Sequence, residues 1–383
     1  MRPSPLGVLC FVVVCITLSL GLWPFHAPRN DVRWLEHING LNFGRHGTVL
    51  SRAPFPRARS SGSIEIWVQP KRWSGSAALL TLYRPGTGLV FTLRQSLTDL
   101  EVSAEYQGAG IRKRPRKSSF YVDDALAPAL QQSKPVLITV TSGSGGTKVY
   151  LEGALAQAVS RFRIPQDAFN GWLIVGDSVG QSDSFFGEIR GLAIYDLDLD
   201  SAEVFQHFRD WRESGSSHLP DASHQTALYL FDERRGDAIH NRAAPGGDLY
   251  IPRKYAVTNQ MFLQPIWEEF NFSRGYWTGD LKNVIGFVPA GFCFYAYFVW
   301  VRPTRRALLL AVIAGALVSL TIEVLQAFLP TRDSGTTDLI TNTLGTCLGA
   351  FCYKRASRVL IQTWPQFAWF AKHPSQAQAQ NRV

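Results

Sequence analysis

A single carboxylate stands inside a long apolar run of the sequence. The run from Ala307 to Leu329 contains one acid, Glu323, in a stretch long enough for a helix that crosses a bilayer. An ionisable side chain is expensive in hydrocarbon and is retained where it has a partner or a function. Glu323 is therefore the first candidate for chemistry, as a proton carrier or a general base.

Other polar side chains are expected at the same depth as Glu323. Together they form a predicted outer polar cluster of Asp280, Lys282, Asn283, Glu323, Gln326, Arg332, Asp338 and Asn342. The candidate catalytic residues of this cluster are Glu323, Arg332 and Asp338. A structural alternative stays open, in which Glu323 hydrogen-bonds Gln326 or Asn342 or pairs with Arg332, and Asp338 caps the next helix.

Four apolar runs must position this cluster. We expect transmembrane helices at about 6–23, 284–301, 307–329 and 337–353. The first run has no small-residue cleavage site after it, so we expect an uncleaved signal anchor, with a signal peptide as the alternative. Bases gather at Arg2, Arg302–Arg306 and Lys354–Arg358, and the positive-inside rule then places both termini in the cytoplasm.

Small residues recur at helical spacing beside the polar cluster. In one set, Ala311, Gly315 and Ser319 precede Glu323 at intervals of four residues. In the other, Gly345 and Gly349 form a GxxxG pair on the same helix as Asn342. Small side chains let helices approach closely, so polar groups can satisfy one another across the interface. We expect a compact bundle with a polar pocket that opens on the extracytoplasmic side. The small positions are Ala311, Gly315, Ser319, Gly345 and Gly349.

Between the first and second apolar runs the sequence changes character. Ser63–Val68, Leu89–Leu93 and Leu137–Val140 alternate apolar and polar residues with period two, and Gly143–Gly146 provides a turn. Many short strands of this kind predict an antiparallel β-sandwich. The expected fold class is therefore mixed, an all-β sandwich outside the cytoplasm joined to an α-helical transmembrane bundle of four helices.

The strand-rich segment carries a recognisable order of motifs. They are Ser63–Pro70, the hairpin Lys148–Gly153, Leu173–Gly176, Phe186–Tyr195 and Ser201–Val204. In this order and spacing, the segment from about Gly40 to Phe208 resembles the laminin-G or concanavalin A-like lectin jelly roll. The resemblance implies carbohydrate binding and, in some members, bound calcium.

Particular residues of the sandwich could carry those two properties. Asp177 and Asp183 flank one loop and could ligate calcium through oxygen, although acids in such loops also form turns. Trp73 and Trp172 could stack on sugar rings or could belong to the core. The sequence presents no paired carboxylates that stand out as a glycosidase acid and nucleophile, which favours a binding module over a hydrolase.

The C-terminal apolar runs carry a second set of motifs. They are Asp280–Asn283 followed by Phe287–Phe292, then Ser319–Gln326, Pro330–Arg332 and Asp338–Gly345. This pattern resembles the VanZ-like family, which is named for a teicoplanin-resistance protein. Ala290 departs from it, because members often have a larger residue there. The resemblance implies that these positions act together at the cell envelope, and it supplies no reaction.

Charge and cysteine usage narrow the function classes. The formal net charge is +9, but the bases at the helix ends account for part of it, so we expect no nucleic-acid partner. The basic run Arg112–Lys117 could meet lipid headgroups or an anionic envelope polymer, or could be a solvated loop. The five cysteines lie in apolar segments and are expected to pack rather than pair.

The predicted organisation has five parts. They are an anchor at 1–30, the sandwich at 31–255, an aromatic interfacial linker at 256–282, the VanZ-like bundle at 283–355, and an interfacial segment with a tail at 356–383. We expect a multi-pass protein of the cell membrane that binds or modifies a glycan or other envelope component, extending to glycopeptide resistance. A non-enzymatic role is favoured; the alternative is an enzyme that acts on an envelope lipid or glycolipid through the cluster around Glu323.

Overall fold

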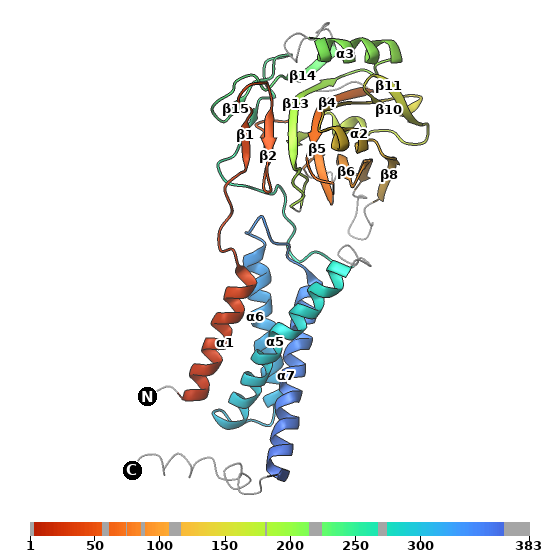
Figure 1. The fold of residues 1–383 in the computed structure, drawn as a ribbon. Helices are drawn as coiled ribbons and strands as arrows, with labels where there is room; N and C mark the ends of the chain where they lie inside the picture. The colour runs from red at the N-terminus through yellow and green to blue at the C-terminus, as the bar shows by residue number, and fades with distance from the viewer. Residues whose placement is uncertain are drawn as a thin grey trace. The chain divides into compact units, whose positions relative to one another are not determined.

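A computed structural model shows the chain as two compact units (Figure 1). It describes residues 4–55, 61–73, 75–85, 89–106, 116–180, 182–213, 224–266 and 274–363. Ala27–Asn259 form one unit, and the chain on either side of that segment forms the other. The basic run Arg112–Lys117 lies outside the described residues except for its last two positions. Three of the six linker aromatics (Trp267, Phe270 and Phe272) and the expected C-terminal interfacial segment after Thr363 also lie outside them.

The first unit is an antiparallel sandwich of two sheets, which confirms the predicted fold class of this segment. The first sheet has the order β1-β2-β13-β4-β9-β10-β11, with β14 paired to β13. Its strands are β1 (Val32–Trp34), β2 (Leu41–Phe43), β4 (Gly62–Pro70), β9 (Val136–Gly143), β10 (Gly146–Leu151), β11 (Ala154–Val159), β13 (Gly187–Tyr195) and β14 (Gln225–Tyr229).

The second sheet has the order β15-β16-β3-β12-β5-β6-β7-β8. Its strands are β3 (Val49–Ser51), β5 (Ser76–Arg84), β6 (Leu89–Ser96), β7 (Asp99–Tyr106), β8 (Arg116–Val122), β12 (Trp172–Val175), β15 (Ala238–Ile239) and β16 (Leu249–Tyr250). Two short helical segments, α2 (Ala127–Gln132) and η1 (Gln166–Ala168), lie in the connections.

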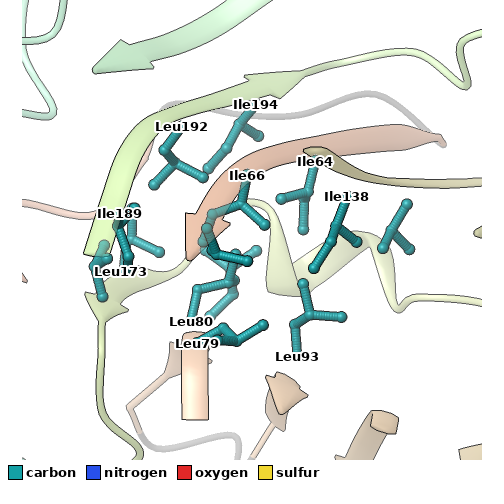
Figure 2. Close-up of a cluster of buried hydrophobic side chains, with 14 of the residues drawn as sticks. Ile64, Ile66, Leu79, Leu80, Leu93, Ile138, Leu173, Ile189, Leu192 and Ile194 are labelled. Atoms are coloured by element: carbon teal, nitrogen blue, oxygen red, sulfur yellow. The ribbon is translucent and has the colours of Figure 1, made fainter. Parts of the chain in front are cut away.

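The sandwich core forms where the apolar faces of the two sheets meet. Period-two alternation sends every second side chain of a strand inward, so Ile64 and Ile66 of β4 lie beside Ile194 and Leu192 of β13 in register. Leu80, Leu93 and Leu173 come from the opposite sheet and complete the cluster (Figure 2). This burial is the main stabilising contribution to the unit.

A helix, α3 (Ser201–Glu213), covers the outer face of the first sheet (Figure 1). A capping box starts it, in which Asp200 Oδ1 accepts from the Glu203 N–H at 2.9 Å and Glu203 Oε2 accepts from the Asp200 N–H at 2.8 Å. Val204, His207 and Trp211 form its buried stripe. The helix therefore presents one amphipathic face to the sheet.

A buried carboxylate joins α3 to the sheet beneath it. Glu65 of β4 accepts hydrogen bonds from Tyr195 and Trp211, each at 3.0 Å, and its other oxygen lies 3.1 Å from His207 Nδ1. A charge can be buried at low cost only where donors surround it in this way. The sequence does not reveal this network, because the three partners of Glu65 lie 130 to 146 residues after it in the chain.

The described residues of the second unit include four helices, α1 (Pro5–Leu22), α5 (Arg274–Trp300), α6 (Ala307–Gln326) and α7 (Thr336–Thr363). By length and composition α1, α5 from Tyr276, and α6 could cross a membrane. This criterion does not select α7, which includes Asp338, Asn342 and the Lys354–Arg358 bases. The helical class and the presence of membrane-capable helices are confirmed; a four-span topology stays a prediction.

Three helix boundaries differ from the expected ones, and one of them is the end of α7, which lies at Thr363 rather than near 353. α5 begins at Arg274 rather than near 284, so Asp280, Lys282 and Asn283 lie inside the helix and not ahead of it. α6 ends at Gln326, because residues 327–332 form turns in which the Leu329 N–H donates to the Gln326 carbonyl at 2.8 Å. An apolar pattern marks the part of a helix in hydrocarbon, whereas backbone hydrogen bonds decide where it starts and stops.

Glycines bring α5, α6 and α7 together. A Cβ at Gly345 or Gly349 would collide with the backbone carbonyls of Val284 or Val288, and one at Gly315 would collide with the Thr346 side chain. Only glycine permits such close approach of two helices. The predicted small-residue positions therefore lie at the helix contacts, and they fix how the polar side chains meet.

Candidate functional site

The buried stripe of α6 leads directly to its acid. Ala311, Gly315 and Ser319 are buried at i+4 spacing, and Glu323 follows with 1% of its surface exposed. Because successive i+4 positions lie on one helix face, the small residues draw that face against its neighbours and take Glu323 inside with them. Burial of this carboxylate is a consequence of the spacing in the sequence.

The Glu323 carboxylate holds the turn that precedes α7. Its Oε2 accepts a hydrogen bond from the backbone N–H of Gly335 at 2.8 Å. Nearby, Asn342 of α7 donates from Nδ2 to the Ser319 hydroxyl at 2.9 Å. The acid and the amide thus tie α6 to both the turn and the body of α7.

Gln326 lies one turn after Glu323 and reaches α1. Its Nε2 donates to the backbone carbonyl of Gly21 at 2.9 Å. Its carbonyl oxygen, Oε1, is buried and has no hydrogen-bond partner among the described residues. Asn342 Oδ1 is likewise buried without a hydrogen-bond partner among the described residues. Buried polar atoms without partners are uncommon in folded proteins and indicate that something else satisfies them.

A second pair links α5 and α7. Asn283 Nδ2 donates to Asp338 Oδ1 at 2.7 Å. Asp338 lies in the first turn of α7, where a carboxylate is favoured by the helix dipole. The helix-capping alternative and the functional alternative for Asp338 are therefore compatible.

These side chains surround one cavity of about 330 Å³, here called the Glu323 cavity. Its lining residues come from α1, α5, α6 and α7. Its lining residues are Thr17, Leu20, Gly21, Lys282, Asn283, Gly286, Phe287, Ile322, Glu323, Gln326, Asp338 and Asn342. A polar cavity among apolar helices can hold the polar part of a ligand and exchange protons with it.

Six residues of the predicted outer polar cluster line this cavity, and two do not. Asp280 lies further toward the start of α5, and Arg332 donates from Nε to the Trp23 carbonyl at 3.0 Å. Arg332 thus joins the turn to the end of α1. Its use as a catalytic group on a ligand in the cavity has no support from this geometry.

Sequence reasoning missed the residues that hold the turn between α6 and α7. Gln260 donates from Nε2 to the carbonyls of Leu329, at 2.8 Å, and Arg332. The Gln264 N–H donates to the Ser334 carbonyl at 2.8 Å, and the Thr336 N–H donates to the Gln264 carbonyl at 3.0 Å. This segment lies in the expected linker, and the partners of its two glutamines lie 69 to 72 residues away in the sequence, which no local pattern marks.

Sequence reasoning also missed the contribution of α1. Thr17 and Gly21 line the cavity from a helix that the sequence marks only as an anchor. A signal was present, because a hydroxyl and a glycine at i and i+4 interrupt an otherwise apolar face. The first helix is therefore part of the site and not only a tether.

In the sandwich, the two calcium candidates lie close together but already have protein partners. Asp177 Oδ1 accepts from the Ser178 and Asp183 N–H groups at 2.9 and 2.8 Å, and Asp183 pairs with Arg94. Burial raises the pKa of Asp177 to about 7, although hydrogen bonds from Tyr255, Asp183 and Ser178 act against it. Burial raises the pKa of Asp183 to about 6, against the lowering effect of Arg94.

This arrangement does not fit a calcium site as it stands. Calcium takes six to eight oxygen ligands, and here a guanidinium and two backbone N–H groups occupy the carboxylate oxygens. Within the described ranges, no group of three or more His, Cys, Asp or Glu could hold a metal ion. Calcium binding stays an expectation from the family resemblance, and no step below depends on it.

The two candidate sugar-stacking residues differ in exposure. Trp73, in the turn between β4 and β5, is 49% exposed, whereas Trp172 on β12 is partly buried. Gln95 fixes the turn that carries Trp73, because its Nε2 donates to the carbonyls of Arg72 and Leu97 at 2.8 and 2.9 Å. Trp73 is therefore the better placed of the two to contact a ligand.

Comparison with protein families identifies both parts of the chain. Residues 241–361 match the VanZ/LLP1 family, and residues 44–205 match the concanavalin A-like lectin/glucanases superfamily. The chain joins a VanZ-like segment to a concanavalin A-like domain. Both resemblances expected from the sequence are confirmed. The VanZ-like match covers α5, α6 and all but the last two residues of α7, so the Glu323 cavity combines VanZ-like helices with α1.

Comparison with curated proteins gave no match. Among solved structures, a candidate carbohydrate-binding protein of Bacteroides ovatus aligns at 12% identity with a TM-score of 0.38, covering 59% of this chain and 63% of that one. The receptor-binding domain of botulinum neurotoxin D aligns at 13% identity and a TM-score of 0.33, covering 48% and 47%.

A third solved structure is the CBM40 of a Ruminococcus gnavus IT-sialidase bound to α2,3-sialyllactose. It aligns at 14% identity with a TM-score of 0.33, covering 44% of this chain and 95% of that domain. This chain spans less than two thirds of each of the first two structures. Because every TM-score is below 0.5, the assignment of the sandwich rests on its sheets and on the family match.

Proposed function

We propose that the VanZ-like chain is an integral membrane protein of the cell envelope that binds an envelope component and alters its exposure to glycopeptides. The observation that carries this proposal is the Glu323 cavity, in which a buried carboxylate and three side-chain amides gather among four helices, three of which are apolar enough to cross a membrane. Polar groups are expensive in hydrocarbon, so a bundle that gathers several of them is expected to use them.

The topology of the proposal has four spans, with α7 as the fourth. With four spans, the bases Arg2, Arg302–Arg306 and Lys354–Arg358 all fall on one side of the membrane. The positive-inside rule identifies that side as the cytoplasm. The sandwich and the turn that contains Gly335 then lie on the extracytoplasmic side. α7 has 28 residues, which is enough to cross a hydrocarbon core of about 30 Å at about 1.5 Å per residue.

The sandwich supplies the glycan-binding part of the proposed function. Its support is the concanavalin A-like match together with the exposed Trp73 on a fixed turn. An aromatic ring presents a flat apolar face to the C–H groups of a sugar. We assign Trp73 as the residue that contacts an envelope glycan.

The first experiment tests the cavity in cells. Wild-type protein and Glu323→Gln are expressed in a host sensitive to teicoplanin-type glycopeptides, and membrane abundance and sensitivity are both measured. We expect the wild type to protect and the variant to be equally abundant but inactive. Absence of protection by an abundant wild-type protein would remove the glycopeptide part of the proposal.

The second experiment tests the sandwich. Full-length protein in nanodiscs is incubated with purified cell-wall glycan polymers, and co-sedimentation is measured for wild type, Trp73→Ala and Phe205→Ala. Phe205 is 53% exposed on α3 and serves as the matched control for loss of an exposed aromatic ring. We expect Trp73→Ala alone to reduce binding by about fivefold or more, the loss typical of one stacking contact. Equal binding by all three proteins would contradict the assignment of Trp73.

A second candidate function is an enzyme acting on an envelope lipid or glycolipid. The observation in its favour is that Glu323 is buried yet lines a cavity large enough for a substrate group, as a general base requires. Chemical analysis of envelope lipids from cells expressing wild type or Glu323→Gln separates the two candidates. A product that accumulates only with the wild type would establish the enzyme.

A further inference from the structure

The helices α1 and α5 pack together at one end and separate toward the other. Cys10 Sγ on α1 donates to the Cys293 carbonyl on α5 at 3.3 Å, and Val13 packs against the apolar cluster that contains Ala290. The same face of α5 continues one turn earlier at Gly286, because a helix face repeats every three to four residues. Gly286 is exposed, and a Cβ there would meet no atom of the described residues within 4 Å. The two helices therefore diverge before Gly286 (Figure 1).

The other end of α1 is held by α6 and the turn after it. Gln326 donates to the Gly21 carbonyl at 2.9 Å, and Arg332 donates to the Trp23 carbonyl at 3.0 Å. A Cβ on Gly21 would lie only 3.0 Å from the Ile322 side chain of α6. The first helix thus crosses from α5 to α6 along its length. This crossing leaves a gap between α1 and α5 beside the Glu323 cavity.

This gap is open to the surroundings of the bundle. We call it the α1–α5 slot and define it by Leu20 of α1 and by Lys282 and Gly286 of α5, all of which are exposed and also line the Glu323 cavity. Leu20 is 72% exposed and belongs to an apolar helix long enough to cross a membrane. In the proposed topology, the slot therefore faces the bilayer and joins the cavity to it sideways.

The borders of the slot are apolar. On α1, Ile16 lies one turn before Leu20 and is 53% exposed. On α5, Leu281 and Ile285 lie next to the slot and are each 59% exposed. A hydrocarbon chain can cover these side chains without burying any polar group that would need a partner. The borders therefore fit the acyl chain of a lipid.

Lys282 is the charged group of the slot. Its side chain is exposed, and its ammonium group makes no ion pair or hydrogen bond with any residue that the structure describes. A lysine in a membrane-capable helix is expected to find an anion or to reach headgroup level. Of the two acids that line the cavity, Glu323 is buried and accepts from Gly335, and Asp338 accepts from Asn283. The exposed ammonium group is thus the first charge that a headgroup in the slot meets.

We propose that a membrane lipid with an anionic phosphate occupies the α1–α5 slot, with its phosphate on Lys282 and an acyl chain against Leu20 and Ile285. A lysine ammonium group binds phosphate as a point charge, and a low dielectric strengthens the attraction. The inference rests on the proposed function, because it names the envelope component as a phosphate-bearing lipid. Free phosphate has the same charge but no chain for the apolar borders, and the experiment distinguishes the two.

The experiment measures ligand retention by the full-length protein. Protein purified in a maltoside detergent is incubated with phosphatidylglycerol, with a diacylglycerol of the same acyl chains, or with inorganic phosphate. Native mass spectrometry counts the retained ligand, and thermal unfolding gives the midpoint. We expect phosphatidylglycerol to be retained and to raise the midpoint, and the other two probes to do neither.

Variants connect retention to the slot. Lys282→Gln removes the charge and Gly286→Leu fills the slot; each is expected to lower retention of phosphatidylglycerol by about fivefold or more. Lys282→Arg keeps the charge and is expected to retain the lipid. Lys354→Gln, at an exposed lysine of α7, and Gly279→Leu, at a position of α5 where a Cβ also meets no described atom within 4 Å, are the matched controls and should behave as the wild type does. Unfolding midpoints without lipid establish that each variant is folded.

The outcomes separate this inference from the proposed function. Loss of retention in Lys282→Gln and Gly286→Leu, with retention kept in both controls, supports it. It is overturned if either of those variants retains phosphatidylglycerol as the wild type does, if the diacylglycerol is retained equally, or if inorganic phosphate raises the midpoint as much. Cellular protection without lipid retention would still support the proposed function, whereas retention without protection would remove only its glycopeptide part.

Discussion

Glu323 on α6 accepts a hydrogen bond from the backbone N–H of Gly335 at 2.8 Å, and Gly335 immediately precedes α7. A side chain available for chemistry in the cavity thus also supports the start of the following helix. Any test of its chemistry must therefore keep the acceptor in place. The choice of substitution decides whether stability or function is being measured.

The first prediction separates these two roles of Glu323. Glu323→Leu leaves the buried Gly335 N–H without its acceptor and is expected to lower the free energy of unfolding by about 1–3 kcal/mol. Glu323→Gln keeps a carbonyl oxygen there and is expected to cost less. Thermal unfolding in detergent measures both variants. Equal loss in the two would mean that the hydrogen bond to Gly335 contributes nothing.

The second prediction concerns the glycine contact between α5 and α7. Gly345→Ala would push a Cβ into the Val284 carbonyl and is expected to destabilise the bundle by about 1–3 kcal/mol. Gly279→Ala, on α5, meets nothing within 4 Å and is expected to be neutral or slightly stabilising. Unfolding midpoints of the two variants provide the measurement. A destabilised Gly279→Ala beside an unchanged Gly345→Ala would contradict the helix contact.

The third prediction is a pH dependence carried by His207. Burial lowers the pKa of His207. The hydrogen bond to Glu65 and the charge of Glu65 raise it by more than burial lowers it, so the net pKa of His207 lies above the usual 6.5. A raised pKa in the folded state means that this stabilisation is complete below about pH 6.5 and is lost as pH rises through the folded-state pKa. Detachment of α3 would be favoured on the alkaline side.

Trp211 fluorescence follows this transition, because its indole donates to the same carboxylate. The unfolding midpoint of the wild type is expected to fall more steeply above pH 6.5 than that of His207→Asn. His37→Asn, which removes an exposed histidine, should follow the wild type. Parallel curves for wild type and His207→Asn would exclude a role for the pair in stability.

The fourth prediction concerns Asp177. Burial raises its pKa to about 7, so the folded sandwich binds a proton that the unfolded chain releases near pH 3.8. The stability gained from this proton is complete below about pH 3.8 and is lost as pH rises through about 7. Asp177→Asn mimics the protonated form and keeps an acceptor for the Ser178 and Asp183 N–H groups.

The difference in unfolding free energy between Asp177→Asn and wild type is therefore expected to favour the variant increasingly from pH 4 to pH 8. The change is expected to be on the order of a few kcal/mol. Chemical denaturation at several pH values measures it. A difference that does not change with pH would show that Asp177 is ionised in the folded sandwich throughout this range.

Much of the architecture is readable from local patterns. Period-two alternation in Ser63–Val68 places Ile64 and Ile66 in the core, and i+4 spacing of Ala311, Gly315 and Ser319 places Glu323 on the buried face of α6. These are properties of residues next to one another in the chain. Local geometry determines them before any tertiary contact forms.

The partners of the polar side chains depend on the tertiary structure. Gln326 donates to Gly21, 305 residues away, Arg332 donates to Trp23, and Glu65 gathers donors from β13 and α3. A sequence shows that such groups need partners but not which they choose, because long-range hydrogen bonds follow from how the elements pack. The sequence alone thus determined a sandwich, apolar helices and the candidates for a polar site, whereas helix packing decided that α1 completes the cavity and that Asp280 and Arg332 lie outside its lining.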